Sequence, residues 1–494
     1  MKKIILGVLI LIFSSELSAQ IEGAAFTETG RGAATAFVTD YQALGVNPAN
    51  LGFGNEYNKK FTLGFFQVGA SNYGEGLTRS QLSDVVFNPD GELTLDEKLD
   101  AADRFDNTVL SLDVSSTILG FAINTETAGN FAFSMNFRAN HYSVFNSEAA
   151  GHLFSGFVDP YFDEWHLQNG QVVNNGGPNS NLIDSTEFGL STDPKFAGEL
   201  YDGMIVRDLS YIEYGVGWGK ELYTSDNLSI YGGVGVKYLQ GLYVLDITLE
   251  NETVQQAYTA SSPALGIDYG DGQENSPSFV EGSGFSPVGD GFGFDLGLAV
   301  EVSDQFRFSA SVTDIGSITF DGNVYETKDT LVSDIDNTGI STYNVFTEFD
   351  AFSGEDGLFK WEGVSEKKVN LPTKARFGAA YFLNEKFRFG LDVVLPLNEA
   401  PGNIEKAAFA AGADYLVSDI FRLSAGFAAG DNYDFRIPFG LNFALNEGSW
   451  EFGVSTRDIL YFIRDDRPNI SLAAGFLRFR FGQNEVGSPS RMFN

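Results

Sequence analysis

Strand-like runs fill the chain between Phe61 and Gly482, and the gaps between them alternate between long and short. The short gaps lie at 126–129, 225–227, 303–305, 384–385, 418–419 and 446–448. The long gaps lie at 74–106, 146–209, 250–290 and 321–371, with shorter ones near 398–405, 431–433 and 463–468. Outer-membrane barrels join antiparallel strands by tight turns on one side and longer loops on the other. The pattern therefore predicts an all-β fold, a transmembrane antiparallel β-barrel of about 14 strands over residues 56–482.

Apolar and polar residues alternate within these runs. In the run at 386–395, Phe387, Phe389 and Leu391 face one side, whereas Arg388 and Asp392 face the other. A period of two is expected of a wall between lipid and an internal bore. The sheet must also be closed, because an open edge would leave unpaired backbone groups in hydrocarbon.

The inward positions are rich in charge. The predicted lumen-facing charged residues are Arg138, Arg307, Arg376, Arg388, Asp392, Arg422, Arg436, Glu451, Arg478 and Arg480. Unpaired buried charges are too costly for a dry protein core, so we expect the bore to be filled with water or plugged. Two interpretations remain open. The bases form a structural ladder with carboxylates of the wall and of a plug, or they line an electropositive passage for an anionic head group.

The N-terminus has the features of a secretory signal over residues 1–19. Lys2 and Lys3 precede the apolar stretch 4–13, and Leu17-Ser18-Ala19 supplies small residues for cleavage. A membrane anchor is the alternative, but the apolar stretch is too short to span a bilayer. The chain has no Cys, which excludes disulfides, thiol catalysis and a lipid-modified Cys. Export and the barrel pattern together predict the outer membrane of a Gram-negative cell.

Negative charge is concentrated in the long gaps. The formal net charge is -35, and the four longest gaps carry excesses of 6, 8, 7 and 7 acids, which is 28 of that 35. This sign disfavours nucleic-acid binding. The acidic loops serve solubility through self-repulsion, or they bind divalent cations that bridge to the anionic outer leaflet. The expected partners are accordingly outer-membrane lipids and lipopolysaccharide.

Residues 20–55 precede the first strand and do not alternate. They are rich in Gly and Ala, which allows close backbone packing in a confined space. A disordered tail is the alternative, but the apolar residues Phe26, Phe37 and Leu44 would then be left in solvent. We therefore expect a plug inside the barrel. Residues 483–494 form a polar C-terminal tail.

The same segment carries a family resemblance. Residues 30–36, which include Arg31, are followed by Asp40 and by the turn Asn47-Pro48-Ala49-Asn50-Leu51. This stretch resembles the N-terminal hatch of the long-chain fatty-acid transporter (FadL) family. Residues 371–381 resemble later strands of that superfamily and are equally similar to the PorV-type barrels of the type IX secretion machinery.

The resemblance implies a 14-stranded barrel with a lumenal hatch. In the transporter branch it implies passive transport of small hydrophobic molecules through a lumen pocket and an opening in the wall. In the PorV-like branch it implies a docking subunit that binds a secretion-machinery protein. In the first case Asn47, Pro48 and Ala49 would set the gap between hatch and wall.

The loop 146–209 contains a cluster of aromatic residues. They are Phe154, Phe157, Tyr161, Phe162 and Trp165. Such side chains suit a lid over a ligand pocket or a contact patch for a partner protein.

Another loop contains a helix start. Thr94 and Glu97 form a capping box, which predicts a short helix over 95–105 with Leu95, Leu99 and Ala102 on its packed face. The preceding residues resemble a calcium loop, but Val86 occupies the first ligand position and cannot coordinate a hard cation.

Metal and catalytic motifs are weak. His141, His152 and His166 lack the spacing of a zinc site. Asp268, Asp271 and Glu274 suit a solvated turn better than a loop cation site. No motif brings Ser, His and a carboxylate together, so the sequence predicts neither an enzyme nor a cofactor.

Overall fold

The computed structural model describes residues 25–82, 92–125, 127–270, 273–343, 345, 358–430, 433–464 and 469–483. Its main body is a closed barrel of 14 antiparallel strands. In ring order the barrel strands are β1 (Lys59–Gly74), β2 (Val109–Ile123), β3 (Asn130–Val144), β7 (Ile205–Thr224), β8 (Leu228–Glu250), β10 (Gly289–Val302), β11 (Phe306–Phe320), β16 (Lys374–Phe382), β17 (Phe387–Pro396), β18 (Ala408–Ser418), β19 (Phe421–Gly430), β21 (Phe439–Leu445), β22 (Trp450–Thr456) and β23 (Asn469–Gln483). The predicted fold class is thus confirmed.

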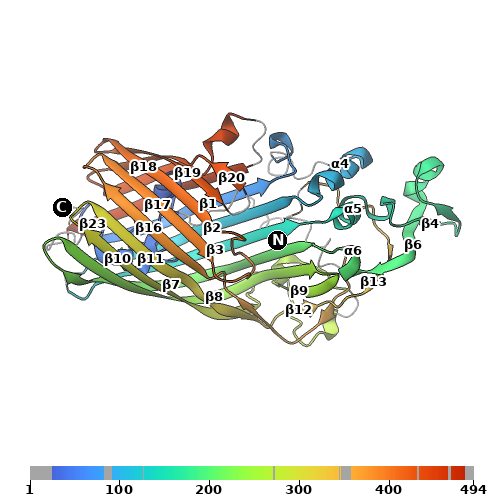
Figure 1. Cartoon of the computed structure of the whole chain (residues 1–494). Coiled ribbons are helices and arrows are strands. Elements are labelled where there is room, and N and C mark those ends of the chain that lie inside the picture. The colour runs from blue at the N-terminus through green and yellow to red at the C-terminus, as the bar shows by residue number, and fades with distance from the viewer. Residues whose placement is uncertain are drawn as a thin grey trace.

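Each strand pairs with its neighbour in the ring, and β1 closes the barrel against β23. Phe61 lies opposite Phe481, and Tyr73 lies opposite Asn469 at the other end of the same seam. Tight turns join strands at one end, seen at the left in Figure 1, and the long connections gather at the other. These are called the turn end and the loop end. The predicted alternation of short and long gaps is therefore realised in space.

The outer wall of the barrel is apolar. Phe292, Leu298, Phe308 and Leu391 are more than half or about half exposed, although each is a large hydrophobic side chain. Their sequence neighbours on the inward rows, such as Arg307, are fully buried. Exposed apolar surface on this scale is unfavourable in water, so the outer wall forms a belt suited to lipid.

Smaller elements lie at the loop end. Extra strands extend the barrel sheet: β9 (Thr253–Ser261), β12 (Val324–Glu326), β14 (Glu362–Gly363), β15 (Lys367–Asn370) and β20 (Tyr433–Arg436). A separate four-stranded sheet has the order β13 (Leu331–Ile335), β6 (Thr186–Phe196), β4 (Glu164–Leu167) and β5 (Val172–Asn174). The helices are α4 (Leu95–Phe105), α5 (Ser147–Ser155), α6 (Ala197–Leu200), η3 (Gly156–Val158), η4 (Gly177–Ser185), η5 (Pro263–Leu265), η6 (Gln273–Asn275) and η7 (Ile459–Phe462).

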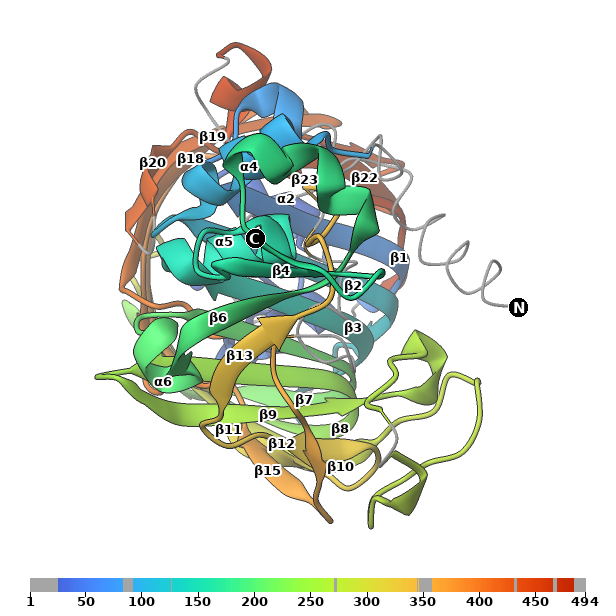
Figure 2. The same cartoon turned by 90° about the vertical axis from the view of Figure 1, so that its right-hand side faces the viewer.

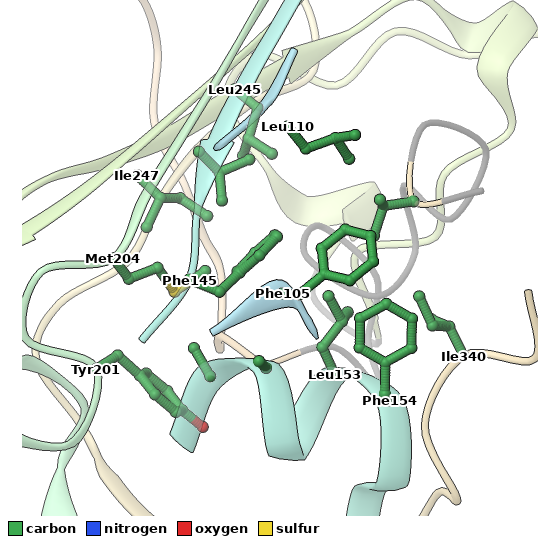
Figure 3. Packing of buried hydrophobic residues seen from close by; sticks show 14 of the residues in the cluster. Phe105, Leu110, Phe145, Leu153, Phe154, Tyr201, Met204, Leu245, Ile247 and Ile340 are labelled. Carbon is green, nitrogen blue, oxygen red and sulfur yellow. The ribbon is translucent and has the colours of Figure 1, made fainter. Parts of the chain in front are cut away.

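The described residues of 75–108, 145–204 and 327–345 form one packed unit at the loop end, here called the cap. Viewed along the barrel, α4, α5 and β4 lie across the ring of strands (Figure 2). One buried core contains three Phe side chains: Phe105 of α4, Phe154 of α5 and Phe145, which lies just before α5 (Figure 3). Leu110 of β2 and Leu245 of β8 join the same core, so the cap packs directly on the strand ends.

Helix α4 begins as predicted but presents a different face. The capping box forms, since Glu97 N–H donates to Thr94 and the Glu97 carboxylate accepts from the Thr94 backbone. The buried residues are Lys98, Ala101 and Phe105, whereas Leu99 is 41% exposed. Of the face predicted from Leu95, Leu99 and Ala102, Ala102 packs against the cap core, but Leu99 does not, because the large Phe105 ring enters that core and fixes the rotation of the helix.

The residues before β1 lie inside the barrel. They comprise α2 (Phe26–Thr29), η1 (Asp40–Ala43) and η2 (Pro48–Phe53), and almost every side chain from 25 to 55 is buried. Helix α2 contacts β21, β22 and β23, while η2 contacts β7, β8 and β10 on the other side of the bore. Residues 25–58 are called the N-terminal segment below.

Several expectations concern residues that the structure does not describe. The signal sequence 1–19, the start of the N-terminal plug at 20–24, the calcium-like loop at 86–90, Asp271 and the tail beyond 483 all fall outside the described residues. Within the described ranges, no helix is both long and apolar enough to span a bilayer. The same ranges contain no grouping of three or more potential metal ligands.

Candidate functional site

The N-terminal segment fits the bore because the wall opposite it is lined with glycine. An added Cβ on Gly412 or Gly426 would collide with the backbone carbonyl of Arg31, and one on Gly64 or Gly120 would collide with the Tyr41 ring. Further inward glycines that touch the segment are Gly217, Gly219, Gly233, Gly297, Gly378, Gly390, Gly440, Gly453 and Gly475. Glycine permits this close approach of backbones because it has no side chain.

Arg31 ties the segment to the wall. Its guanidinium, 1% exposed, forms ion pairs with Glu28 of the segment and with Asp414 of β18, and it lies 3.6 Å from the centre of the Phe37 ring. A buried Arg retains its charge only when opposite charges and hydrogen-bond acceptors surround it. Arg31 is therefore a buried anchor and contributes no free positive charge to the bore.

Asp40 is the second anchor. Its carboxylate is 2.6 Å from Nη2 of Arg478, and Glu451 lies 2.8 Å from Arg478 and 2.6 Å from Arg480. Asp40 also has a positive φ of 50°, a conformation that costs energy for a residue with a side chain. The ion pair with Arg478 thus holds a strained backbone position in place.

Glu56 forms a third anchor near the turn end. It bridges two wall residues, with Oε2 2.7 Å from Arg388 and Oε1 2.6 Å from Arg422. Burial disfavours the charged carboxylate, but Arg422 and Arg388 outweigh that cost and hold the pKa of Glu56 well below its usual range.

The remaining predicted lumen residues are also placed on the inner wall. Arg307 pairs with Glu301 at 2.6 Å and donates to the Ala36 carbonyl at 2.9 Å. Asp392 accepts hydrogen bonds from the backbone N–H groups of Ala34 and Thr35 at 2.7 and 2.9 Å. Arg138 lies 3.4 Å from Glu213. The side chains of Arg376 and Arg436 are also buried.

The turn at 47–49 is fixed from two sides. The Asn47 side chain accepts from the Ala49 N–H at 3.0 Å and donates to the Leu298 carbonyl of β10 at 3.2 Å. Pro48 starts η2, where its lack of an N–H carries no penalty. The turn therefore seats the segment against β10.

One cavity beside the segment is small and polar. It has a volume of about 30 Å³ and lies among Arg31, Glu56, Arg307, Arg388 and neighbouring polar residues. That volume holds about one water molecule. This cavity is too small to hold a hydrophobic solute.

The inward rows change character toward the loop end. On the inward row of β7, Tyr211 lies two residues nearer the loop end than Glu213. On the inward row of β8, Leu239 lies two residues nearer the loop end than Lys237. They belong to a buried cluster, here called the upper apolar layer: Leu209, Tyr211, Leu239, Val244, Tyr258, Ala260, Val288, Ile318, Phe320, Val324, Val369 and Leu371. On the side of the bore formed by β7, β8, β10 and β11, an apolar cluster thus lies above the charged residues around the segment, and the ion pairs of Arg207 with Asp246 and Glu405 lie beyond it toward the loop end.

The aromatic residues of the 146–209 loop lie in the cap. Phe154, Phe157, Phe162 and Trp165 are at most 3% exposed, and Trp165 donates to the Phe157 carbonyl at 2.8 Å. Tyr161 is half-buried and donates to the Val332 carbonyl of β13 at 2.7 Å. They form an interior and do not present an exposed patch.

Sequence reasoning missed the matched glycines of the wall. The signal was available, because Gly390, Gly440 and Gly453 occur at inward positions of strands whose outward positions are large and apolar. Glycine weakens a strand interior, so its repeated presence on one face indicates a close neighbour on that face.

Comparison with known proteins gives one family match. Residues 48–453 match the model of a family described as "Family of unknown function (DUF5723)". No curated protein matches the chain.

The chain is also similar to solved barrel structures. The Pseudomonas putida toluene transporter TodX is 12% identical, with a TM-score of 0.42 over 95% of this chain and 99% of that chain. The "TodX deltaS2S3 mutant monoaromatic hydrocarbon channel" is 10% identical, with a TM-score of 0.45 over 94% and 99%. A Pseudomonas aeruginosa FadL homologue is 12% identical, with a TM-score of 0.39 over 94% and 100%.

Proposed function

The chain belongs to DUF5723, a family of unknown function, and we propose that it is an outer-membrane barrel that passes small hydrophobic molecules across that membrane. The observation that carries the proposal is the upper apolar layer inside the barrel. A water-filled porin has polar inward rows throughout its height. Apolar side chains such as Leu209, Leu239 and Phe320 on inward rows instead favour an apolar solute.

The N-terminal segment would act as the hatch of this pathway. Its anchors are ion pairs and hydrogen bonds, as at Arg31, Asp40 and Glu56, and water can replace such contacts when the segment moves. The solute would enter from the loop end, exchange with side chains of the upper apolar layer and pass when the segment shifts. Lipids of the outer membrane, with lipopolysaccharide in the outer leaflet, would contact the apolar belt.

An engineered disulfide tests the proposal, because the chain has no native Cys. The Ala33 Cβ lies 3.0 Å from an ideal Cβ built on Gly390 of β17. A disulfide needs about 3.5–4.5 Å between Cβ atoms, so the pair Ala33→Cys/Gly390→Cys requires a small separation of the two backbones and a turn of the Phe37 ring, which lies 2.6 Å from the added Cβ. The matched control is Ala413→Cys/Ala425→Cys, a cross-strand pair on the outer wall that leaves the segment untethered.

The measurement is uptake of the hydrophobic dye N-phenylnaphthylamine by Gram-negative cells that lack other hydrophobic-compound channels. We expect cells with the wild-type protein to take up the dye faster than cells without it. The oxidised Ala33→Cys/Gly390→Cys protein should not increase uptake, and reduction of the disulfide should restore the increase. The control pair should retain uptake when oxidised. Equal uptake with and without the wild-type protein would refute transport.

One observation favours a second function. Several buried ion pairs fix the segment, which suits a barrel that stays shut and serves as a docking subunit of a secretion or surface-assembly machine. In that case the protein would add no dye uptake, and mild purification from native membranes would recover a stoichiometric partner protein.

A further inference from the structure

A serine, a histidine and an aspartate meet on the outward face of the barrel wall. His141 and Ser143 lie two residues apart on β3, and Asp208 lies directly opposite His141 on β7. His141 Nδ1 is 2.8 Å from Asp208 Oδ1, and His141 Nε2 is 2.9 Å from Ser143 Oγ. Neither transport nor the hatch uses these three side chains.

The hydrogen bonds assign a role to each group. An ionised carboxylate can only accept, so the proton of the neutral imidazole lies on Nδ1 and is donated to Asp208. Nε2 then accepts a hydrogen bond from the Ser143 hydroxyl. A nucleophile bonded to a base, with the base oriented by a carboxylate, is the arrangement that performs acyl transfer in serine hydrolases of several folds.

The group lies where the apolar belt meets the cap. On β3, Ser134 and Asn136 face the bore, whereas Phe131, His141 and Ser143 belong to the outward row. Phe131 at the turn end is 40% exposed, but His141 and Ser143 are 5% and 0% exposed. The cross-strand neighbours of Ser143 are Leu110 and Val206, both in the cap core.

This position suggests the substrate. The surroundings of Ser143 are apolar, as an acyl chain requires, and the row below it is the lipid-facing wall. The ester groups of membrane lipids lie at the edge of the hydrocarbon region. His141 and Ser143 lie on the outward row of β3 at the corresponding edge of the apolar belt. A carboxylic ester with an apolar acyl chain fits both features.

We propose that Ser143, His141 and Asp208 form a hydrolytic site for apolar acyl esters. Ser143 Oγ bonds to the ester carbonyl carbon and its proton passes to His141 Nε2. The carbon–oxygen bond to the alcohol then breaks, and the alcohol leaves with the proton from Nε2. Water next attacks the acyl-serine, His141 takes its proton and returns it to Ser143, and the carboxylic acid is released. Asp208 is the positioning residue.

Access to Ser143 is controlled by the cap. With Leu110 and Val206 packed beneath the cap helices, the hydroxyl is shielded, so turnover requires separation of the cap from these strands. Leu153→Ala, a substitution in the core of α5, should loosen this cover and speed the reaction.

Covalent labelling is the direct test. Purified full-length protein in detergent is treated with an alkyl fluorophosphonate, in which the serine oxygen bonds to phosphorus and fluoride leaves. We expect one adduct, located on Ser143 by peptide mass spectrometry and formed faster in the Leu153→Ala protein. Ser143→Ala should abolish it, whereas Ser210→Ala, on the outward row of β7, should retain it. Absence of an adduct in both wild-type and Leu153→Ala protein would overturn the proposal, as would an adduct on another residue.

Hydrolysis assays identify the source of the ester. One arm measures release of p-nitrophenol from p-nitrophenyl octanoate, and the other measures release of fatty acid from phospholipid vesicles. Activity in the second arm assigns membrane lipid as substrate, and activity in the first alone assigns a soluble ester. Asp208→Asn should lower kcat by about 10²–10⁴-fold with little change in KM. A loss confined to KM, or no hydrolysis in either arm, would count against the site.

Discussion

The two levels of the bore are held together by different forces. Around the N-terminal segment, Arg31, Asp40 and Glu56 bind charged wall residues, and glycines bring the backbones close. At the loop end, the upper apolar layer and the cap core are sealed by buried hydrocarbon. Polar anchors are specific but exchangeable with water, whereas apolar packing is strong but tolerant of another apolar occupant. The difference suggests a gate below and a solute-accepting layer above.

The largest expected effect comes from breaking a polar anchor. Arg31→Ala leaves Asp414 buried without its ion-pair partner, which should cost about 3–5 kcal/mol. Urea unfolding in detergent micelles measures the loss. Lys328→Ala, which removes an exposed pair with Glu362, is the control and should cost less than about 1 kcal/mol. Equal effects of the two substitutions would show that the segment is not anchored by charge.

Removing hydrocarbon from the cap should have a comparable or slightly smaller effect in a different place. Leu153→Ala leaves a cavity beside Phe154 and should cost about 2–5 kcal/mol of local stability. Limited proteolysis should then cut the cap first and leave the barrel intact. Leu99→Ala on α4 is the matched control, because Leu99 is 41% exposed and its loss should not change the cleavage pattern. Simultaneous loss of cap and barrel would mean that the two regions unfold as one unit.

Acid should weaken the Glu56 anchor. The pKa of Glu56 is depressed in the folded protein, so its contribution is complete above the unfolded value of about 4.3 and is lost as the pH falls below it. On heating, a folded barrel unfolds and its mobility on a gel changes. We expect this change of mobility to occur at a lower temperature at pH 3 than at pH 7. At pH 7 the Glu56→Gln protein should unfold at a lower temperature than the wild-type protein. Its unfolding temperature should also fall less when the pH is lowered to 3. An unchanged acid response in that variant would assign the effect to other carboxylates.

The smallest effect concerns the helix cap of α4. Thr94→Ala removes the acceptor for the Glu97 N–H and should cost about 1 kcal/mol. Hydrogen exchange should speed up in the first turn of α4 and stay unchanged in the N-terminal segment. Ser80→Ala, at an exposed position of the same loop before α4, should change neither region.

The parts that were predictable from sequence are those set by local patterns. Alternation in 386–395 and the parity of the gaps depend on neighbours along the chain, and Thr94 with Glu97 specifies a helix start within four residues. The charged inward positions followed from the same alternation. Their partners did not, since Arg31 and Asp414 are separated by 383 positions.

Features that depend on register escaped the sequence. His141 and Ser143 reveal nothing until β3 is aligned with β7 across the connection that forms much of the cap, and only that alignment places Asp208 opposite His141. The rotation of α4 was not predicted for the same reason, because Phe105 packs against Phe145 and Phe154 of another loop. The roles of Asn47, Pro48 and Ala49 as a gate, and of the bases as a passage, remain predictions.

The seam between β1 and β23 joins the two ends of the barrel sequence. The ring therefore cannot close without its final fifteen-residue strand. The wall that closes at this seam has the segment packed inside it. A larger residue in place of one of the inward glycines would then prevent the wall from closing around the segment. Such a substitution should reduce the amount of folded barrel and not only its permeability.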